Sequence, residues 1–255
     1  MTSRKPARRA PAPPAPGGAR KGKRFYGTGI PGVDTEKLPG TLVVLEGPDG
    51  SGRSSQAALL TEWLERKGYA VESAGLRRSY LAGDALAEAK RGNVLSPRTL
   101  SLFYATDFAD QLENRIIPAL RAGFVVLADR YIYTLMARDM VRGAEPEWLR
   151  SVYSIALVPD LVLYLRVTPP RLLERFIYQG KGLDYWESGM DLGYSRSWYD
   201  SFLRYQGDLH RVFTRLQGEY GFVPVNGMRS RGSVNRELQA RIEAVLAERE
   251  GGTRI

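Results

Sequence analysis

The segment Gly47-Pro48-Asp49-Gly50-Ser51-Gly52-Arg53-Ser54 constrains the fold of this chain more than any other segment. Before it, Thr41 to Leu45 is a short run of β-branched and apolar residues, which is typical of a buried strand. After it, apolar residues recur at helical spacing and predict a helix from about Ser54 to Lys67. A strand, a glycine-rich loop and a helix in this order form a phosphate-binding loop. Glycine lets backbone N–H groups turn toward phosphate oxygens, and the helix N-terminus adds partial positive charge.

The residues of this loop are predicted to bind the phosphates of a nucleotide. They are Gly47, Pro48, Asp49, Gly50, Ser51, Gly52, Arg53, Ser54 and Ser55. The hydroxyl of Ser54 is placed to bind Mg²⁺. Arg53 stands where such loops usually carry lysine, and its guanidinium is a wide planar fork rather than a compact ammonium. Arg53 either clamps the β- and γ-phosphates or fits poorly and slows the reaction, and the sequence leaves both open.

Strand and helix signals alternate along the rest of the chain. Four further strands are expected, at Tyr69–Ala74, Phe124–Ala128, Leu161–Val167 and Phe222–Val225. Four further helices are expected. One runs from Ser96-Pro97 toward Leu120 with a bend or break at Pro118, and one begins at Thr168-Pro169-Pro170. One spans Trp198–Tyr220 and is stopped by Gly221, and the last is capped by Ser233 with Val234, Leu238, Ile242 and Val245 inward. This alternation predicts an α/β fold with a mainly parallel sheet of about five strands flanked by helices. Ligands of such sheets bind beyond the carboxyl ends of the strands.

The positive charge of the chain is concentrated at its start. The net charge is +9, and residues 1–24 carry eight basic residues and no acidic one. This segment is rich in Pro, Ala and Gly, so we predict a disordered basic tail. Its charge suits weak, salt-sensitive contact with nucleic acid, or it only keeps the protein soluble. Residues 25–40 form a Gly/Pro arm, and 41–250 form the domain. The arm contains G-x-G-x-x-G from Gly27 to Gly32, but no strand precedes it, so dinucleotide binding is not expected.

Several classes of protein are excluded or disfavoured by composition. The chain has no cysteine, so disulfides and thiolate catalysis are excluded. Its longest apolar run, around Leu161 to Leu165, is far too short for a membrane helix, and the start of the chain lacks the apolar stretch of a secretory signal. These features fit a cytoplasmic protein without a membrane partner. His210 is the only histidine, and a surface or groove role is expected for it rather than general-base catalysis.

Four segments together resemble the thymidylate kinase family in their order and spacing. They are Leu42 to Gly52 followed by Gln56, Leu102 to Asp107, Asp129-Arg130-Tyr131, and Leu183-Asp184 with Glu187. The resemblance covers about residues 41–247. It implies a P-loop nucleoside-monophosphate kinase that uses ATP and Mg²⁺ to phosphorylate a nucleotide substrate, with dTMP as the leading acceptor. Members of the family are commonly homodimers.

The resemblance also implies roles for individual residues. Asp49 would bind the 3′-hydroxyl of the acceptor sugar, Arg130 would clamp the acceptor phosphate, and Asp129 would help organise the magnesium shell. Arg53, Arg130, Asp129 and Lys181 are therefore the expected catalytic residues. Cations over the transferring group suit phosphoryl transfer, which depends on positioning and charge neutralisation.

For other charged residues, the sequence allows either a role in the site or an ordinary surface position. Arg77 or Arg78 would also face the acceptor phosphate. Arg175 and Lys181 lie in or beside the segment that corresponds to the family's mobile lid, and they could close over the transferring phosphoryl group. Asp184 and Glu187 belong to the site or merely pair with lid cations. For Arg171 we expect an ordinary surface position.

Departures from the family cluster on the acceptor side. Phe108 stands where the family usually has an arginine that reads the base, and it can stack on a base instead. Thr134 or Leu135 falls where a polar residue often contacts the base edge. Arg138 replaces a tyrosine that packs on the deoxyribose, and the family's Arg-Glu-Pro reads Arg78-Ser79-Tyr80. The predicted substrate-binding set is Asp49, Arg78, Phe108, Arg130, Leu135 and Arg138, with acceptor selectivity broader than, or different from, dTMP.

Two alternative functions remain from the sequence. One is a P-loop kinase for another phosphorylated or hydroxyl-bearing acceptor. The other is a non-catalytic nucleotide-binding regulatory protein, which Arg53 and the altered acceptor residues motivate.

Overall fold

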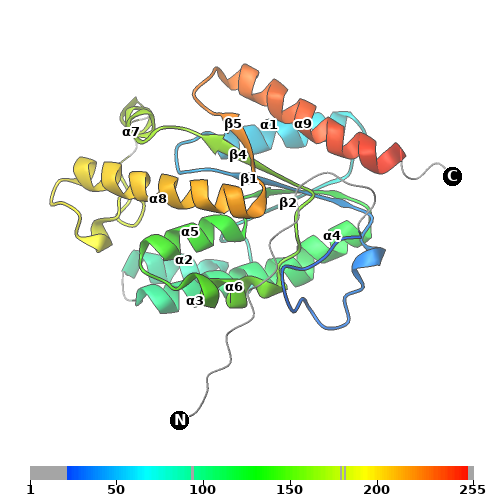
Figure 1. The fold of residues 1–255 in the computed structure, drawn as a ribbon, viewed down its shortest axis with the longest axis horizontal. Helices are drawn as coiled ribbons and strands as arrows, with labels where there is room; N and C mark the ends of the chain where they lie inside the picture. Colours follow the sequence, from blue (N-terminus) through cyan, green and yellow to red (C-terminus); the bar gives the residue numbers. More distant parts are fainter. Residues whose placement is uncertain (1–21, 93–94, 179, 181, 252–255) are drawn as a thin grey trace, which may run out of the picture.

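The five strands form one parallel sheet in the order β2-β3-β1-β4-β5 (Figure 1). The computed structural model describes residues 22–92, 95–178, 180 and 182–251. The strands are β1 (Thr41–Glu46), β2 (Val71–Gly75), β3 (Val125–Asp129), β4 (Leu161–Arg166) and β5 (Val223–Asn226). Each predicted strand is confirmed, with its bounds shifted by at most two residues, and the predicted fold class is confirmed as well.

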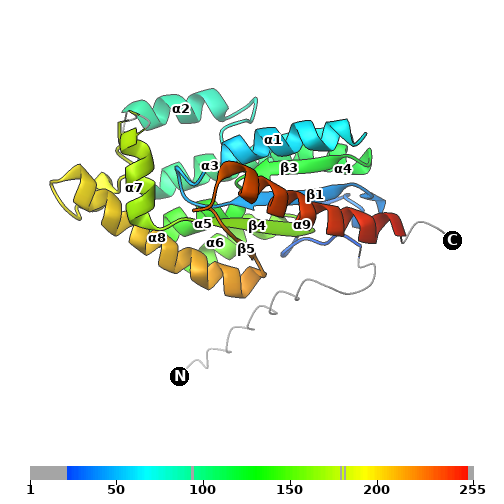
Figure 2. The same ribbon diagram turned by 90° about the horizontal axis from the view of Figure 1, so that it is seen from above.

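Helices cover both faces of the sheet (Figures 1 and 2). One face carries α1 (Arg53–Arg66) and α9 (Arg231–Gly251), and the other carries α3 (Pro97–Gln111), α5 (Ile132–Val141) and α8 (Trp198–Tyr220). The remaining helices are α2 (Gly83–Gly92), α4 (Ile117–Arg121), α6 (Pro146–Val152) and α7 (Pro169–Tyr178), with short turns η1 (Thr35–Lys37), η2 (Leu112–Ile116), η3 (Tyr153–Ile155) and η4 (Met190–Leu192).

Strand β1 shows why the sheet is buried on both sides. Leu42 and Val44 pack in the core with α5 and α8, whereas Val43 and Leu45 pack in a second core with α1 and α9. All four side chains are fully buried. Successive residues of a strand point to opposite faces, so a continuous apolar run suits a strand covered by helices on both sides. The loops at the carboxyl edge of the sheet therefore begin from strands that are buried on both faces.

The helices differ from the sequence prediction in three respects. The helix expected toward Leu120 is divided into α3, the π-helical turn η2 and α4, with Pro118 in the first turn of α4. Proline has no N–H for the helical ladder and its ring crowds the preceding turn, which accounts for the break. Ser230, not Ser233, caps α9, because the Ser233 N–H lies 3.3 Å from the Ser230 hydroxyl oxygen. Helices α2, α5 and α6 were not predicted.

The first described residues differ from the prediction of a disordered segment up to residue 24. Lys23 belongs to the segment predicted to be disordered, yet its side chain is buried and lies 2.5 Å from Asp160, just before β4. The N–H of Leu42 and the guanidinium of Arg249 also bind this carboxylate. Burial lowers the pKa of Lys23 to about 8, although Asp160 opposes this. These contacts, here called the Asp160 cluster, lie at the amino edge of the sheet. Residues 1–21 lie outside the described residues.

The arm continues along the same edge. Phe25 pairs with Leu157 in an antiparallel bridge, and the N–H of Gly27 donates to the carbonyl of Ser154. The ring of Tyr26 packs edge-on against Tyr133 and Tyr220. The G-x-G-x-x-G segment of the arm therefore lies at the end of the sheet opposite the Gly47–Ser54 loop.

Replacing Lys23 is expected to destabilise the domain. Lys23→Ala should lower the free energy of unfolding by about 2 kcal/mol, because it removes one partner of a buried ion pair. Urea unfolding would measure this. Removing residues 1–21 should leave stability unchanged, and so should Lys37→Ala, whose ion pair with Asp34 is exposed. Equal unfolding midpoints for Lys23→Ala and Lys37→Ala would contradict a structural role for Lys23.

Candidate active site

The loop between β1 and α1 depends on glycine for its shape. Gly47, Gly50 and Gly52 have φ angles of 149°, 77° and 94°, which side-chain-bearing residues rarely adopt. A Cβ on Gly50 would lie 2.9 Å from the ring of Phe176 in α7. Gly52 is the N-cap of α1 and provides no side-chain cap for it. The amino end of α1 therefore opens into the loop, where its N–H groups favour an anion.

Arg53 is held between two carboxylates. One guanidinium nitrogen donates to Asp129 Oδ1 at 2.7 Å, and another lies 3.7 Å from Asp49 Oδ1. The Ser54 hydroxyl donates to the other oxygen of Asp129, also at 2.7 Å. Asp129 ends β3 and is the register partner of Leu45 in β1, so the sheet itself brings these groups together. Arg53 is buried, and burial lowers its pKa while Asp129 opposes that effect.

Asp49 is surrounded by guanidinium groups. Arg130 forms an ion pair with Asp49 Oδ1, and Arg138 Nη2 donates to Oδ2 at 2.6 Å. With Arg53, three arginines from three parts of the chain meet at one loop carboxylate. Burial, together with the charge of Arg138, lowers the pKa of Arg130 to about 9. The three arginines carry more positive charge than Asp49 and Asp129 carry negative charge. This excess of positive charge suits a site for phosphate groups.

Arg130 has an uncommon backbone conformation. Its φ is 77°, and its N–H donates to the carbonyl of Leu45 at 3.0 Å. A left-handed conformation costs a residue with a side chain on the order of 1 kcal/mol, so the surroundings must impose it. Such strain is concentrated at functional sites, and here it directs Arg130 toward Asp49.

Glu46 binds backbone N–H groups directly after Arg130. The sequence did not indicate this role for Glu46. It is fully buried, and its Oε1 accepts the N–H groups of Tyr131 at 2.9 Å and Thr134 at 3.2 Å. Its Oε2 accepts the Thr134 hydroxyl at 2.5 Å. Burial raises the pKa of Glu46, and these hydrogen bonds oppose the rise. Glu46 thus caps α5, whose N-cap residue Tyr131 provides no side-chain cap.

Three polar atoms around the loop are buried and have no partner among the described residues. They are Ser51 Oγ, Arg53 Nε and Arg130 Nε. A buried donor without an acceptor costs about 1–3 kcal/mol, so it points to a missing ligand atom. Phosphate oxygens are acceptors only, and they fit this set of donors. For Mg²⁺, the Ser54 hydroxyl and Asp129 carboxylate are hard oxygen ligands of the kind the ion prefers.

A second part of the site lies beyond Arg138. Leu135, Arg138, Tyr104, Trp186 and Tyr205 line a small cavity of about 30 Å³. Aromatic and aliphatic side chains of this kind can contact a flat ring, but a cavity of this volume would have to widen to admit one. Two of the predicted substrate-binding residues, Leu135 and Arg138, therefore share one cavity, and Arg138 connects it to Asp49.

Arg142, one turn after Arg138, holds the outer wall of this cavity. It makes two hydrogen bonds with Asp191, at 2.8 and 3.0 Å, and donates to the Tyr205 hydroxyl at 2.9 Å. It also donates to the carbonyl of Trp186 at 3.0 Å. Arg142 therefore fixes the segment around Trp186 against α5 and α8. No local signal in the sequence pairs Arg142 with Asp191.

Phe108 does not lie where stacking on a base would be available. Only 4% of it is exposed, and its ring packs edge-on against Tyr131 and Tyr153, with centroids 5.1 and 6.0 Å away. The preceding residue, Asp107, accepts the N–H groups of Arg77 and Ser79 at 2.8 and 2.9 Å. The helical spacing turns Asp107 toward the β2–α2 loop and Phe108 into the core. We therefore do not retain the stacking role predicted for Phe108.

The remaining predicted residues are placed as follows. Arg78 is exposed, and its guanidinium donates to the carbonyl of Ala74 at 3.4 Å. Arg175 binds the loop itself, donating to the carbonyls of Gly50 and Ser51 at 3.1 and 3.0 Å and to that of Gly227 at 2.7 Å. Arg171 forms an exposed ion pair with Glu174.

Three further predictions concern residues around the lid and the loop. Asp184 accepts the N–H groups of Trp186 and Glu187 at 2.9 and 3.1 Å, so it caps a turn. Ser55 is exposed in the first turn of α1. Lys181 lies outside the described residues.

Two other features are absent from the part of the chain that the structure describes. Across residues 22–251, apart from the gaps given above, no helix is long and apolar enough to cross a membrane. The same residues contain no group of three or more His, Asp or Glu side chains arranged to hold a metal ion.

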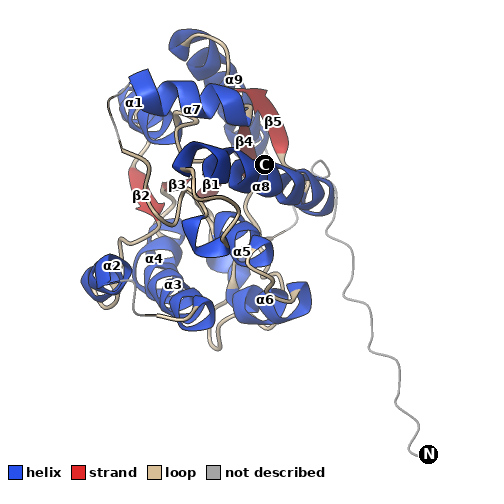
Figure 3. Cartoon of the chain, turned by 90° about the vertical axis from the view of Figure 1, so that its left-hand side faces the viewer, coloured by secondary structure: helices blue, strands red, loops and turns tan. Residues whose placement is uncertain are grey.

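The site lies at the carboxyl edge of the sheet, onto which Figure 3 looks, with β2 and β5 at its two ends. Strand order, glycine loop and converging cations together define a P-loop nucleotide kinase. The family model described as thymidylate kinase matches residues 45–213. The chain belongs to the thymidylate kinase family.

Individual relatives agree with this assignment. "Probable thymidylate kinase 2" of Saccharolobus solfataricus is 38% identical over 214 residues, which are 83% of this chain and 97% of the relative. "Thymidylate kinase" of Caldanaerobacter subterraneus subsp. tengcongensis is 32% identical over 75% of this chain and 93% of its own length. "Probable thymidylate kinase" of Thermococcus kodakarensis is 29% identical over 81% of this chain and 99% of its own length.

Proposed function

We propose that this protein transfers the γ-phosphoryl group of ATP to dTMP and so forms dTDP and ADP. One observation carries the proposal: Arg53, Arg130 and Arg138 converge on Asp49 beside the glycine loop. Membership of the thymidylate kinase family and the names of the relatives support it. The donor phosphates would lie in the loop and the acceptor phosphate against Arg130.

The chemistry requires little beyond position and charge. A phosphate oxygen of dTMP attacks the γ-phosphorus of ATP, the bond from that phosphorus to the β–γ bridging oxygen breaks, and ADP leaves with that oxygen. The loop N–H groups and Arg53 would hold the β- and γ-phosphates, and Arg130 would hold the attacking group in line. Mg²⁺, when bound by Ser54 and Asp129, would supply further neutralisation of the phosphate charge. Both Asp129 oxygens now accept hydrogen bonds, so Arg53 or Ser54 would have to reorient.

The decisive experiment is ADP formation from Mg·ATP with a panel of nucleoside monophosphates. We expect stimulation to be largest with dTMP. If dUMP, dCMP or dGMP stimulates ADP formation as much as dTMP does, base selection is relaxed. The apolar side chain of Leu135 in the cavity favours such relaxed selection. ATP binding without stimulation by any acceptor would contradict the proposed function.

Arg138 should contribute to acceptor binding. Arg138→Ala is expected to raise the KM for the acceptor about tenfold, because the cavity loses a cation that also holds Asp49 in place. The KM for ATP should change less than twofold. Steady-state kinetics with each substrate varied would measure both. The control is Arg241→Ala, which removes one exposed positive charge from α9. An acceptor KM like that of the control would place the acceptor away from Arg138.

The surroundings of the protein are also part of the proposal. We infer a cytoplasmic homodimer, on the basis of its resemblance to other family members, and weak contact of the basic tail with nucleic acid. The eight basic residues of 1–24 support the tail contact, although Lys23 is engaged with Asp160. Light scattering tests the dimer. A mobility shift at low salt that disappears when residues 1–21 are removed tests the tail.

A further inference from the structure

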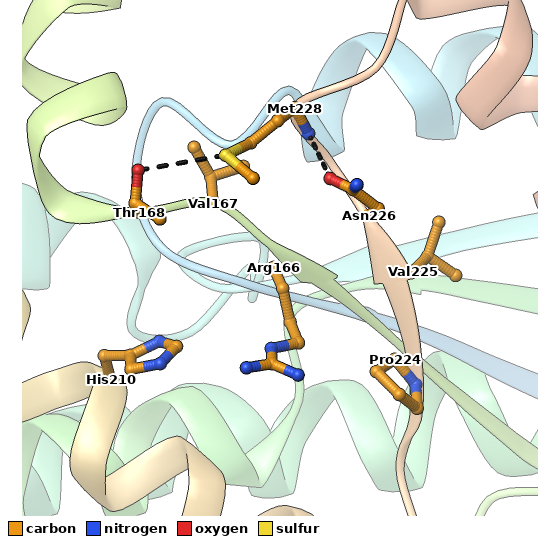
Figure 4. Close-up of a pocket in the computed structure, with 8 residues that line it drawn as sticks. All are labelled: Arg166, Val167, Thr168, His210, Pro224, Val225, Asn226 and Met228. Atoms are coloured by element: carbon orange, nitrogen blue, oxygen red, sulfur yellow. Dashed lines mark hydrogen bonds between the residues drawn. The ribbon is translucent and has the colours of Figure 1, made fainter.

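A hollow of about 410 Å³ lies beside the ends of β4 and β5 (Figure 4). Strand register pairs Tyr164 with Pro224 and Arg166 with Asn226. Tyr164 belongs to the core shared with α8, whereas Leu165 and Val225 belong to the core shared with α1 and α9. Because side chains alternate along a strand, Arg166 projects on the α8 side of the sheet. The hollow is therefore separated by the sheet from α1, and none of residues 47–55 lines it.

Two basic side chains face this hollow. Arg166 comes from the end of β4 and His210 from the middle of α8, and Figure 4 shows both side chains directed into the same space. In the part of the chain that the structure describes, neither side chain has a hydrogen bond or an ion pair. No Asp or Glu is among the described residues that line the hollow. The pair therefore lacks a neutralising group from the protein.

The electrostatics of His210 agree with this geometry. Partial burial lowers the pKa of His210, and the charge of Arg166 lowers it further. No acidic group raises it. Other arginines of this protein that are less exposed have partners: Arg142 meets Asp191, Arg150 meets Glu219, and Arg175 meets backbone carbonyls. Arg166 is exposed at the end of β4 and His210 is half-buried, and both border the hollow, so an anion there would offset the repulsion between them.

The other walls indicate what the anion is attached to. Val167, Pro224 and Met228 present apolar surface, and the hollow is larger than a free phosphate ion requires. The start of α7 adds little, because Pro169 and Pro170 have no N–H to donate. The Thr168 hydroxyl is directed toward the sulfur of Met228, at 3.8 Å. The anion would therefore be held by side chains rather than by a helix end.

We propose that the hollow binds a phosphate group between Arg166 and His210, either as the free ion or as part of a small molecule whose body contacts Pro224 and Met228. This site is separate from the donor and acceptor sites at the glycine loop. The phosphate can belong to inorganic phosphate or to a nucleotide, and both present the same chemistry to the two cations.

His210 is a convenient reporter, because it is the only histidine in the chain. In untagged full-length protein, the imidazole C–H resonance followed against pH gives the pKa of His210 without assignment. We would compare chloride with inorganic phosphate at equal ionic strength, and then with a deoxynucleoside triphosphate in the absence of metal. We expect phosphate groups to raise the pKa of His210 in a saturable manner, since an anion stabilises the imidazolium.

Two variants sharpen the test. Arg166→Gln should raise the pKa of His210 in chloride, which checks that the two groups face each other, and should abolish the further rise caused by phosphate. Arg215→Gln removes an exposed positive charge from the same helix, outside the hollow, and should preserve the response. Saturation at lower concentration by the triphosphate would identify a nucleotide as the source, and equal or tighter binding of inorganic phosphate would identify the free ion.

Some outcomes would overturn the proposal. They are the absence of a saturable change with both ligands, and an equal change in Arg166→Gln. Neither result depends on turnover, so the test separates this site from the proposed kinase activity.

Discussion

Arg130→Ala is expected to lower kcat/KM for phosphoryl transfer about a thousandfold, the scale of losing a cation that acts on a transferring phosphoryl group. Arg130 follows β3 in a strained conformation and meets Asp49, and its Nε is buried without a partner among the described residues. The variant loses a cation that is positioned in two ways: by the left-handed backbone of Arg130 and by Glu46, which binds the N–H of the next residue, Tyr131. Arg130→Lys should recover only a small part of the activity, because an ammonium cannot bind a phosphate in the bidentate manner of a guanidinium.

The control for Arg130 must separate chemistry from folding. Thermal unfolding of the variant should stay within a few degrees of the parent, since Asp49 keeps Arg53 and Arg138 as partners. Single-turnover kinetics with ATP saturated would locate the loss in the chemical step. Retention of more than a tenth of the parent activity would remove Arg130 from the reaction and direct attention to Arg138.

Arg53→Met is the second change with a large expected effect, again about a thousandfold in kcat. The loop would keep its backbone donors and lose its buried side-chain cation, and Asp129 and Asp49 would be left with less positive charge. Arg53→Lys is the informative companion. An ammonium at this position is the usual solution in such loops, so we expect activity within about tenfold of the parent.

Rates for the two Arg53 variants can be measured in the same coupled assay. Arg66→Met, in the last turn of the same helix, removes an exposed positive charge and should leave the rate unchanged. Full activity in Arg53→Met would show that Arg53 serves Asp129 structurally and does not act on phosphate. Inactivity of Arg53→Lys would show that the rest of the site has adapted to the guanidinium.

Local sequence signals were sufficient for the sheet and for most of the helices. The glycine loop, the strand ends and the stop at Gly221 depend on residues next to one another in the chain. Helix α5 was missed for a physical reason. Its N-terminal N–H groups bind Glu46, which comes from β1 and lies far away in the sequence. Without a Ser, Thr, Asp or Asn before it, the segment carries no local start signal.

The candidate site divides in the same way. The meeting of Ser54, Arg53 and Asp129 follows from strands that end at one edge of a parallel sheet, which the sequence predicts. The contact of Arg142 with Asp191 joins segments 49 residues apart and depends on how α5 packs against α8. The burial of Phe108 also depends on packing, because its neighbour Asp107 takes the polar side of the helix.

The Asp160 cluster has a mechanical consequence. Lys23 comes just after the start of the described chain and Arg249 near its end, and both grip one carboxylate beside the first residues of β1 and β4. Arg249 also binds the carbonyls of Pro39 and Gly40, which lead into β1. A force applied at either end, for example by an ATP-dependent unfoldase, would therefore act first on contacts to the same carboxylate. Detaching Lys23 or Arg249 from Asp160 removes one of the two cations that share this carboxylate. A substitution that weakens the cluster should therefore lower the unfolding force measured from either end.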